Sequence, residues 1–213
     1  MSFLFRLSLI FLVGLSLLTP GLALAWPANP DLLAGQARTG STQALEELTE
    51  LAEDGDAVAQ YNLALLLLDD QGPQPYRERG VEWLRKAAEG GHIGAQYRLG
   101  QIYEPTDPSR AAAWYRVAAD QGHLAAQVQL AKMYWEGRGV RHDYEAVLRL
   151  LRSAAGAGLP EAQYRVGWML EWGLGTDREI EEAVLFYGQA AESGHQLARQ
   201  RLEALADAVA EEP

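Results

Sequence analysis

Three histidines are the side chains of this sequence best suited to acid–base chemistry or metal binding, and they stand at equivalent places. His92, His123 and His195 each follow a glycine at the end of a helical stretch of sequence. Packed helices lie about 8–10 Å apart, which is too far for neighbouring imidazoles to share a zinc ion with bonds of about 2.0–2.1 Å. We therefore predict no metal site and interpret these histidines as helix-end residues that the helix dipole favours. His142 lies in a turn and has no predicted role.

Signatures of catalysis are missing from the rest of the sequence. The chain has no cysteine, which excludes thiol catalysis, thiolate metal sites and disulfide bonds. No phosphate-binding loop, dinucleotide-binding fingerprint, G-x-S-x-G elbow or H-E-x-x-H motif occurs. The sequence therefore predicts a protein that is not an enzyme and that needs no cofactor.

Acidic side chains dominate the charge of the chain and gather near residue 50. The formal net charge of −11 repels nucleic acid and anionic lipid, so neither is an expected partner. The local cluster consists of Glu46, Glu47, Glu50, Glu53 and Asp54. A general acid and a general base need unequal environments, and nothing in the sequence indicates that this cluster is buried. It is either a solvated helix face or a docking patch for a basic segment of a partner.

Tryptophan is the other residue type that points to a function, because it is enriched at interface hot spots. At about 100° per residue, Tyr164, Trp168 and Trp172 form one stripe of a helix, about 140–150° from a second stripe that begins at Gln163. One helix cannot bury both stripes within its own pair. The aromatic stripe, together with Trp135 of the preceding unit, therefore either packs on the adjacent unit or binds a partner.

A repeated unit positions these residues. One glutamine recurs at Gln60, Gln96, Gln127 and Gln163, with Arg199 in a fifth, partial copy, at intervals of 36, 31, 36 and 36 residues. A period in the mid-thirties is typical of solenoids built from helix pairs. We predict an all-α solenoid with four repeats at residues 57–92, 93–123, 124–159 and 160–195. A capping segment at 26–56 and a capping helix with an acidic tail at 196–213 flank them.

Each unit is predicted to contain two helices. The first carries a small residue that lets a neighbouring helix approach closely, at Ala64, Gly100, Ala131 and Gly167. The second ends at an alanine pair followed by a glycine, which suits a left-handed helix end. Helix starts are predicted at Pro160, at Asp107 followed by Pro108, and at a capping box formed by Thr176 and Glu179.

The first 25 residues have the layout of a secretory signal peptide. Arg6 precedes an apolar run at residues 7–18, then come a break at 19–21 and Ala-Leu-Ala at 23–25. The apolar run is short of the roughly 20 residues that span a bilayer. We predict cleavage after Ala25, with an uncleaved anchor as the alternative. The mature protein would be periplasmic or secreted, with no stable membrane insertion.

The pattern A-x-x-L-G-x-x-Y, a glycine-rich turn and A-x-x-W-Y-x-x-A-A-x-x-G resembles the Sel1-like repeat, a relative of the tetratricopeptide repeat. The turn that starts at Gly137 and the stretch AAAWYRVAADQG match it best, while Gly80 and Val147 depart from its usual alanine. The resemblance implies a right-handed solenoid whose first helices line a concave, partner-binding face. The residues expected on that face are Tyr61, Leu65, Tyr97, Gln101, Glu104, Lys132, Trp135, Tyr164, Trp168, Glu171 and Trp172.

Two classes of function remain open at this point. The first hypothesis is a non-catalytic scaffold or adaptor that binds another envelope protein or peptide. Glu171 and Glu136 favour a basic partner. The alternative is a protein that binds a small ligand or cell-wall glycan, or hydrolyses such material, because some exported proteins of the resembled family carry a β-lactamase label. Neither the partner nor the oligomeric state follows from the sequence.

Overall fold

The computed structural model describes residues 28–69 and 74–210, and within these ranges it contains eleven α-helices and no β-strand. The helices are α1 (Pro30–Arg38), α2 (Thr42–Glu53), α3 (Ala57–Asp69), α4 (Gln74–Glu89), α5 (Ile93–Tyr103), α6 (Pro108–Asp120), α7 (Leu124–Glu136), α8 (Tyr144–Gly156), α9 (Pro160–Trp172), α10 (Ile180–Glu192) and α11 (Gln196–Ala210). The predicted all-α class is confirmed. The predicted signal peptide at residues 1–25 and the end of the acidic tail at 211–213 lie outside the described residues.

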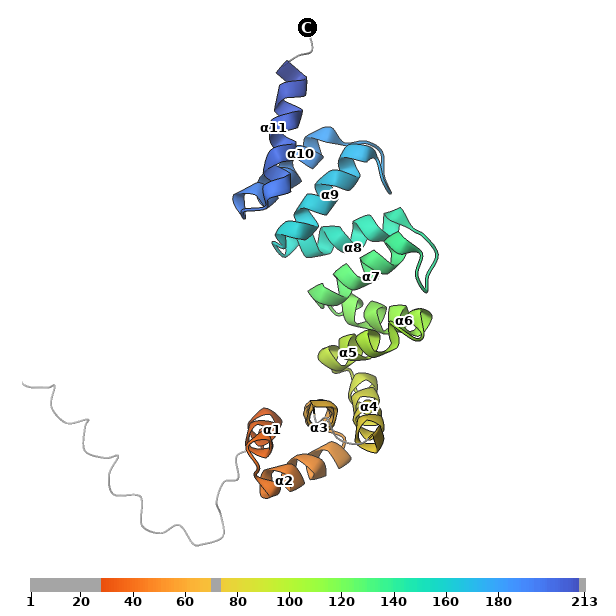
Figure 1. Ribbon diagram of the computed structural model, residues 1–213, viewed down its shortest axis with the longest axis vertical. Helices are drawn as coiled ribbons and strands as arrows, with labels where there is room; N and C mark the ends of the chain where they lie inside the picture. Colours follow the sequence, from red (N-terminus) through yellow and green to blue (C-terminus); the bar gives the residue numbers. More distant parts are fainter. Residues whose placement is uncertain (1–27, 70–73, 211–213) are drawn as a thin grey trace, which may run out of the picture.

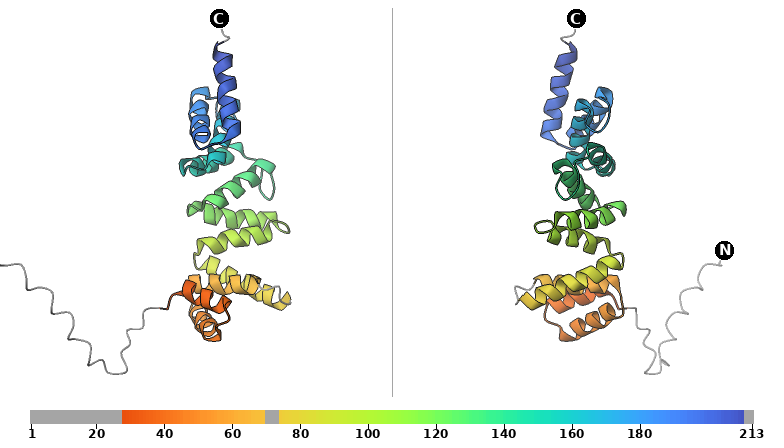
Figure 2. Two further views of the ribbon diagram at one scale, coloured as in Figure 1. Left: turned by 60° about the vertical axis from the view of Figure 1, so that its left-hand side comes forward. Right: turned by 90° about the vertical axis from the view of Figure 1, so that its right-hand side faces the viewer.

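Consecutive helices form hairpins that stack in one direction along the molecule (Figures 1 and 2). The hairpins are α3–α4, α5–α6, α7–α8 and α9–α10, and each helix packs mainly on the helices next to it in sequence. Helices α1 and α2 cover one end of the stack, where α1 also contacts α3, and α11 lies at the other end. This is the predicted solenoid, in which each unit buries its apolar face against its neighbours.

The recurring glutamine joins each first helix to the helix before it. Its side chain is buried in all four repeats, and its Nε2 donates a hydrogen bond to a backbone carbonyl eight residues earlier. The donor–acceptor distances are 3.0 Å for Gln60, 3.2 Å for Gln96 and Gln127, and 3.3 Å for Gln163. Because each acceptor is the second residue of an alanine pair or its equivalent Ala52, the two repeated sequence features bind each other.

The small residue of the first helix is also where two helices meet most closely. A Cβ added at Gly100 would lie 2.4 Å from the ring of Tyr115 in α6, and one at Gly167 would lie 2.9 Å from the ring of Tyr187 in α10. Both distances are shorter than carbon atoms tolerate without movement. The tyrosine rings therefore lie on the glycine backbone, as the predicted close approach requires.

Two of the three predicted helix starts are confirmed. Pro160 opens α9, and Asp107 caps α6 by accepting a hydrogen bond from the Arg110 N–H at 3.1 Å, with Pro108 next in sequence. The predicted capping box at Thr176 is wrong, because α10 begins only at Ile180 and Glu179 makes no side-chain cap. The Glu179 N–H instead donates to the Leu170 carbonyl at 3.0 Å, which keeps the preceding residues in a turn.

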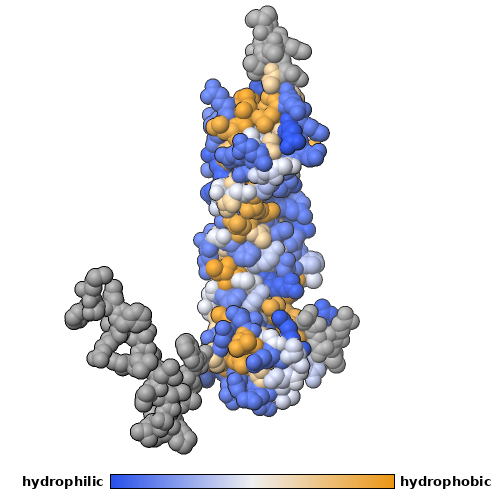
Figure 3. All heavy atoms as spheres, turned by 90° about the vertical axis from the view of Figure 1, so that its left-hand side faces the viewer, coloured by the Kyte–Doolittle hydropathy of each residue, from blue (hydrophilic) through white to orange (hydrophobic). Residues whose placement is uncertain are grey.

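Apolar side chains also reach the surface, in separate patches among polar ones along the stack (Figure 3). The two largest exposed fractions among the apolar side chains of α9 and α10 belong to Leu185, at 66%, and Trp172, at 60%. Within residues 28–69 and 74–210, no helix combines the length and the hydropathy that a membrane span requires.

Candidate partner-binding face

The three equivalent histidines cap the helices that follow them. The Nδ1 atoms of His92, His123 and His195 accept hydrogen bonds from the N–H three residues later, at 3.1, 3.1 and 3.3 Å. An accepting Nδ1 carries no proton, so these imidazoles are neutral caps at the start of α5, α7 and α11. The prediction that the helix dipole favours these histidines is therefore wrong. They lie at helix N-termini, where the dipole disfavours a positive charge.

The same histidines stack on three tyrosines that the sequence places on the binding face. Ring centroids are 4.2 Å apart for Tyr61 and His92, 4.6 Å for Tyr97 and His123, and 4.6 Å for Tyr164 and His195. In repeats 1, 2 and 4 the tyrosine thus covers the cap of the next unit. In repeat 3 both partners change together, to Val128 and Leu159, a paired difference that could have revealed the contact from the sequence.

His195 has a second partner, which determines its tautomer. Its Nε2 lies 3.0 Å from Oε2 of Glu161, while its Nδ1 accepts from a backbone N–H. The Nε2 therefore carries the proton and donates it to the carboxylate. Partial burial opposes ionisation of Glu161, but hydrogen bonds from His195 and Arg165 outweigh it and lower the pKa of Glu161. Burial lowers the pKa of the His92 imidazole, against the opposing charge of Asp31.

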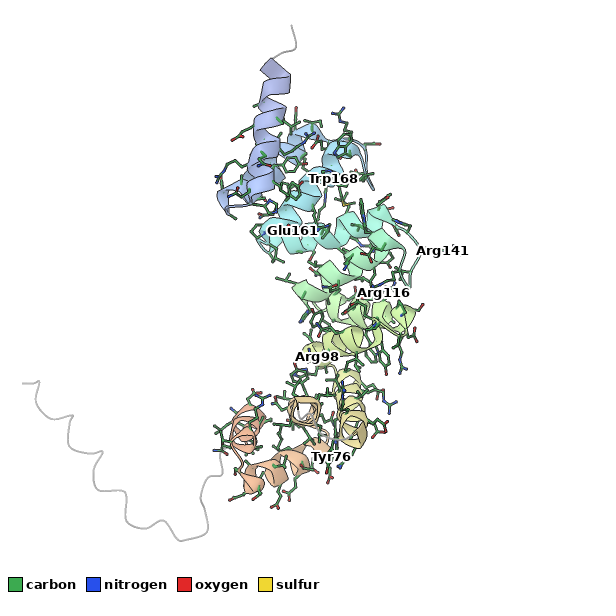
Figure 4. All side chains as sticks on the ribbon, viewed as in Figure 1. Tyr76, Arg98, Arg116, Arg141, Glu161 and Trp168 are labelled. Atoms are coloured by element: carbon green, nitrogen blue, oxygen red, sulfur yellow. The ribbon has the colours of Figure 1, made fainter. Side chains whose placement is uncertain are left out.

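The three tryptophans divide between packing and exposure. Trp135 of α7 lies edge-on to Trp168 of α9, with ring centroids 5.7 Å apart, and contacts Tyr144 at 4.9 Å. Both indoles are half-buried against the core. Figure 4 shows Trp168 on α9, which begins beside Glu161. Trp172, the last residue of α9, is 60% exposed, so it is the member of the stripe that is available to a partner.

Glu171 was expected to face a partner, and the predicted exposure is wrong. It is only 3% exposed, and Oε2 accepts hydrogen bonds from the Tyr187 hydroxyl at 2.8 Å and from Nε of Arg201 at 2.8 Å. Nη2 of Arg201 donates to its other oxygen. The carboxylate is therefore fully engaged inside the protein. Arg201 lies in the incomplete fifth copy of the repeat. The repeat pattern therefore does not predict that an arginine binds Glu171.

Glu104 occupies the equivalent place in repeat 2 and is more accessible. Its Oε2 accepts from the Tyr115 hydroxyl at 2.7 Å, and Oε1 accepts from Nη2 of Arg138. The Glu104 side chain is 21% exposed, against 3% for Glu171. Burial raises the pKa of Tyr115 to about 12, and burial together with Glu171 raises that of Tyr187 further. Both tyrosines are therefore neutral hydrogen-bond donors rather than bases.

The remaining residues of the predicted face are mostly polar and interact with one another. Gln101 and Lys132 are exposed, and Leu65 is half-buried. Nε2 of Gln101 donates to the Tyr97 hydroxyl at 3.2 Å. Lys132 lies 3.9 Å from Glu136, which is the second carboxylate expected to favour a basic partner. The described part of the chain contains no group of three or more His, Asp or Glu side chains that could hold a metal ion.

Comparison with known proteins identifies the repeat. The sequence model described as Sel1 repeat matches residues 57–92, 93–123, 124–159 and 160–195, which together exceed half of the chain. The chain is a Sel1 repeat protein. The resemblance inferred from the sequence is thereby confirmed. Proteins of this family generally mediate protein–protein interactions and typically act as non-catalytic scaffolds.

Solved structures of the family share the fold. This chain is similar to the crystal structure of a Sel1 repeat protein from Oxalobacter formigenes, with a TM-score of 0.72 and 28% sequence identity. The match covers 82% of this chain and 74% of that protein. This chain is also similar to a protective antigen of uropathogenic Escherichia coli strains, with a TM-score of 0.65 and 34% identity, over 74% of this chain and 35% of that one.

Two curated relatives are much longer than the Sel1 repeat protein described here. An uncharacterized protein of Neisseria meningitidis is 30% identical, over 78% of this chain and 44% of its own length. Chitin synthase regulatory factor 3 of Schizosaccharomyces pombe is 32% identical, over 80% of this chain and 20% of its own length. The chain thus spans less than half the length of either relative.

Proposed function

We propose that this Sel1 repeat protein is a non-catalytic scaffold of the bacterial cell envelope, which binds another envelope protein or peptide on the face lined by its first helices. The observation that carries the proposal is the 60% exposure of Trp172, next to the packed pair Trp135 and Trp168. Burial of a large, rigid aromatic side chain is a common source of affinity at protein interfaces.

The surroundings of Trp172 hold it on a rigid support. The adjacent Glu171 is bound to Tyr187 and Arg201, and Nε of Arg178 donates to the Glu171 backbone carbonyl at 3.0 Å. These contacts join α9 to α10, α11 and the intervening turn. A partner that covers Trp172 would therefore meet a surface that loses little conformational freedom on binding.

The envelope location rests on the signal peptide predicted at residues 1–25. N-terminal sequencing of the protein purified from a periplasmic fraction tests it. A mature chain that starts at Trp26 would support export and cleavage. An intact N-terminus in the cytosolic fraction would contradict both.

The test of binding is a cross-linked capture from the envelope with the mature chain and two single variants. Trp172→Ala removes the exposed indole, and Leu185→Ala is the matched control, since Leu185 is equally exposed but lies on the second helix α10. The proposal predicts a partner that is retained by Leu185→Ala and lost by Trp172→Ala. A partner retained by both variants would move the binding face elsewhere.

A carbohydrate ligand is the alternative occupant of the same indole, because a flat exposed aromatic ring can also stack on a sugar. The fungal relative's name refers to regulation of a polysaccharide synthase, which fits an adaptor near cell-wall synthesis as well. Titration of Trp fluorescence separates the two. Quenching by cell-wall glycans, absent in Trp172→Ala, would favour the glycan ligand over a peptide.

A further inference from the structure

One line of residues on α10, the second helix of repeat 4, faces away from the core. It consists of Glu181, Leu185, Gly188 and Glu192. Their spacing of four, three and four residues places them within about 60° of one another around the helix. The fully buried residues of α10 lie on the other side, at Ala183, Tyr187 and Ala190. We refer to the four outward residues as the outer line of α10.

The centre of the outer line differs between repeat 4 and the other repeats. Leu185 is 66% exposed, the largest fraction of any large apolar side chain in the described residues. Counted from the alanine pair, the other second helices carry at the positions of Leu185 and Gly188 the pairs Glu82 and Arg85, Ala113 and Arg116, and Arg149 and Arg152. Each of these pairs includes a charged side chain. The uncharged centre is therefore specific to α10.

Gly188 has no packing reason within the described chain. Glycine is a poor helix former, and the tyrosine rings of the facing helices explain its use at Gly100 and Gly167. At Gly188, however, the backbone is helical and an added Cβ would meet no atom within 4 Å. A glycine beside an exposed leucine leaves a recess in the helix surface next to a protruding side chain. Such a surface lets a second helix approach the backbone closely.

The two ends of the outer line are acidic. Glu181 and Glu192 are exposed, and within residues 28–69 and 74–210 neither forms an ion pair. Helix α10 itself contains no lysine or arginine, and Arg152 of α8 is already bound to Glu182 at 2.7 Å. The eleven residues from Glu181 to Glu192 correspond to about 16 Å along the helix. The outer line is therefore complementary to an apolar helix face with a basic side chain at each end.

A second copy of the chain fits this line poorly. Two antiparallel α10 helices that place Leu185 of each on Gly188 of the other would also place Glu181 of each beside Glu192 of the other. A parallel pair would set each glutamate against itself. Like charges that face each other across an interface are unfavourable, so the charges favour a different protein.

We propose that the outer line of α10 binds a helix of a partner protein, which presents an apolar side chain to Gly188 and basic side chains to Glu181 and Glu192. This surface goes beyond the proposed function, because it lies on a second helix and does not involve Trp172. Basic residues eleven positions apart on one face of the partner helix would reach both glutamates. The net charge of −11 attracts such a helix from solution.

The test uses a fluorescent, alanine-based helical peptide of about 18 residues as the probe. It carries a central leucine and two lysines eleven residues apart on the same face. We expect the mature chain to bind it with a Kd on the order of 100 μM. The same peptide with glutamate in place of both lysines should bind at least about tenfold more weakly. Equal affinities for the two peptides would contradict the charge complementarity and overturn the proposal.

Gly188→Ala separates binding from folding. The added methyl group meets no atom of the described chain, and alanine favours the helix, so Tm should rise. The same methyl group fills the recess, so the probe should bind at least about fivefold more weakly. An unchanged affinity would show that the probe does not contact Gly188, and the proposed site would then be wrong.

Leu185→Ala and a matched control test the specificity of the apolar contact. Leu185→Ala should weaken the probe at least about tenfold, because it removes the side chain that the probe buries. Val117→Ala removes another exposed apolar side chain, 42% exposed, from the second helix α6. It should leave the affinity unchanged within about twofold. Equal losses in both variants would indicate unspecific attraction to exposed apolar groups and overturn the proposal.

Sedimentation of the mature chain tests the other occupant. We expect the same oligomeric state for the wild type and Leu185→Ala. A dimer that dissociates in Leu185→Ala would assign the outer line to a second copy and overturn the proposal. Trp172→Ala should leave the affinity for the probe unchanged, so this surface and the proposed binding at Trp172 can fail separately.

Discussion

The contact between the two helices of a repeat differs between the even-numbered repeats, 2 and 4, and the odd-numbered repeats, 1 and 3. Repeat 2 combines Gly100, Tyr115 and Glu104, and repeat 4 combines their equivalents Gly167, Tyr187 and Glu171. Repeats 1 and 3 have alanine, leucine and an apolar residue at the same three places, namely Ala64, Leu84 and Leu68, and Ala131, Leu151 and Trp135. The three positions therefore change as a set.

The structure gives the reason for this joint change. A tyrosine ring needs the space of a missing Cβ in the facing helix, whereas a leucine leaves room for alanine. The buried hydroxyl of the tyrosine then needs an acceptor, which the glutamate supplies at 2.7–2.8 Å. The tyrosine thus determines the other two residues. In repeats 2 and 4 the glutamate also binds an arginine, Arg138 or Arg201.

The largest expected loss of stability comes from combining the alanine of the odd-numbered repeats with the tyrosine of the even-numbered ones. Gly100→Ala would place a methyl group 2.4 Å from the Tyr115 ring. We expect a loss of about 2–3 kcal/mol in unfolding free energy, because overpacking outweighs the helix propensity that alanine adds. Urea denaturation measures it.

The control for this prediction is the double variant Gly100→Ala/Tyr115→Leu, which recreates the alanine–leucine pair of repeats 1 and 3. It should recover most of the lost stability. Equal instability of the single and double variants would show that the three positions do not form a set.

The second effect compares the two glutamates. Glu171→Gln leaves Arg201 without its anion in a site that is 3% exposed on the glutamate side, and should cost about 2–3 kcal/mol. Glu104→Gln affects a more exposed pair and should cost about 1 kcal/mol. Equal losses by thermal denaturation would contradict the difference in burial between the two repeats.

A pH effect is expected from Glu171 of repeat 4. The hydrogen bonds from Arg201 lower the pKa of Glu171 and outweigh the opposing effect of its burial. The unfolded chain therefore binds the proton more tightly, so this stabilisation is complete above about pH 4.3 and is lost as the pH falls through the folded pKa. The unfolding free energy, followed from pH 6 to pH 3, should decline less steeply in Glu171→Gln than in the wild type. Parallel declines would exclude this assignment.

The smallest effect concerns the histidine caps, which occur after both kinds of repeat. His92→Ala should lose about 1 kcal/mol at pH 8, as for other helix caps. Because burial lowers the pKa of His92, its contribution is complete above about pH 6.5 and fades as the pH falls through the folded value. The difference between variant and wild type should therefore shrink at pH 5. A constant difference would indicate a packing role only.

The sequence predicts the fold well because the repeat is local. Gln96 and Ala88 recur in phase, and their spacing alone indicates which helices meet. The contacts of the candidate binding face are harder to predict from the spacing of the repeat. Arg201 and Arg138 reach equivalent glutamates from different elements, a helix and a turn, so no fixed spacing reveals them. The neutral state of His123 likewise depends on a backbone bond that only the folded chain forms.

The most direct test of the central claim is the affinity of the purified envelope partner for three forms of the mature chain: wild type, Trp172→Ala and Leu185→Ala. The scaffold account predicts at least about a thirtyfold rise in Kd for Trp172→Ala, equivalent to about 2 kcal/mol, and less than a twofold change for Leu185→Ala. An unchanged Kd for Trp172→Ala would contradict binding on the face of the first helices.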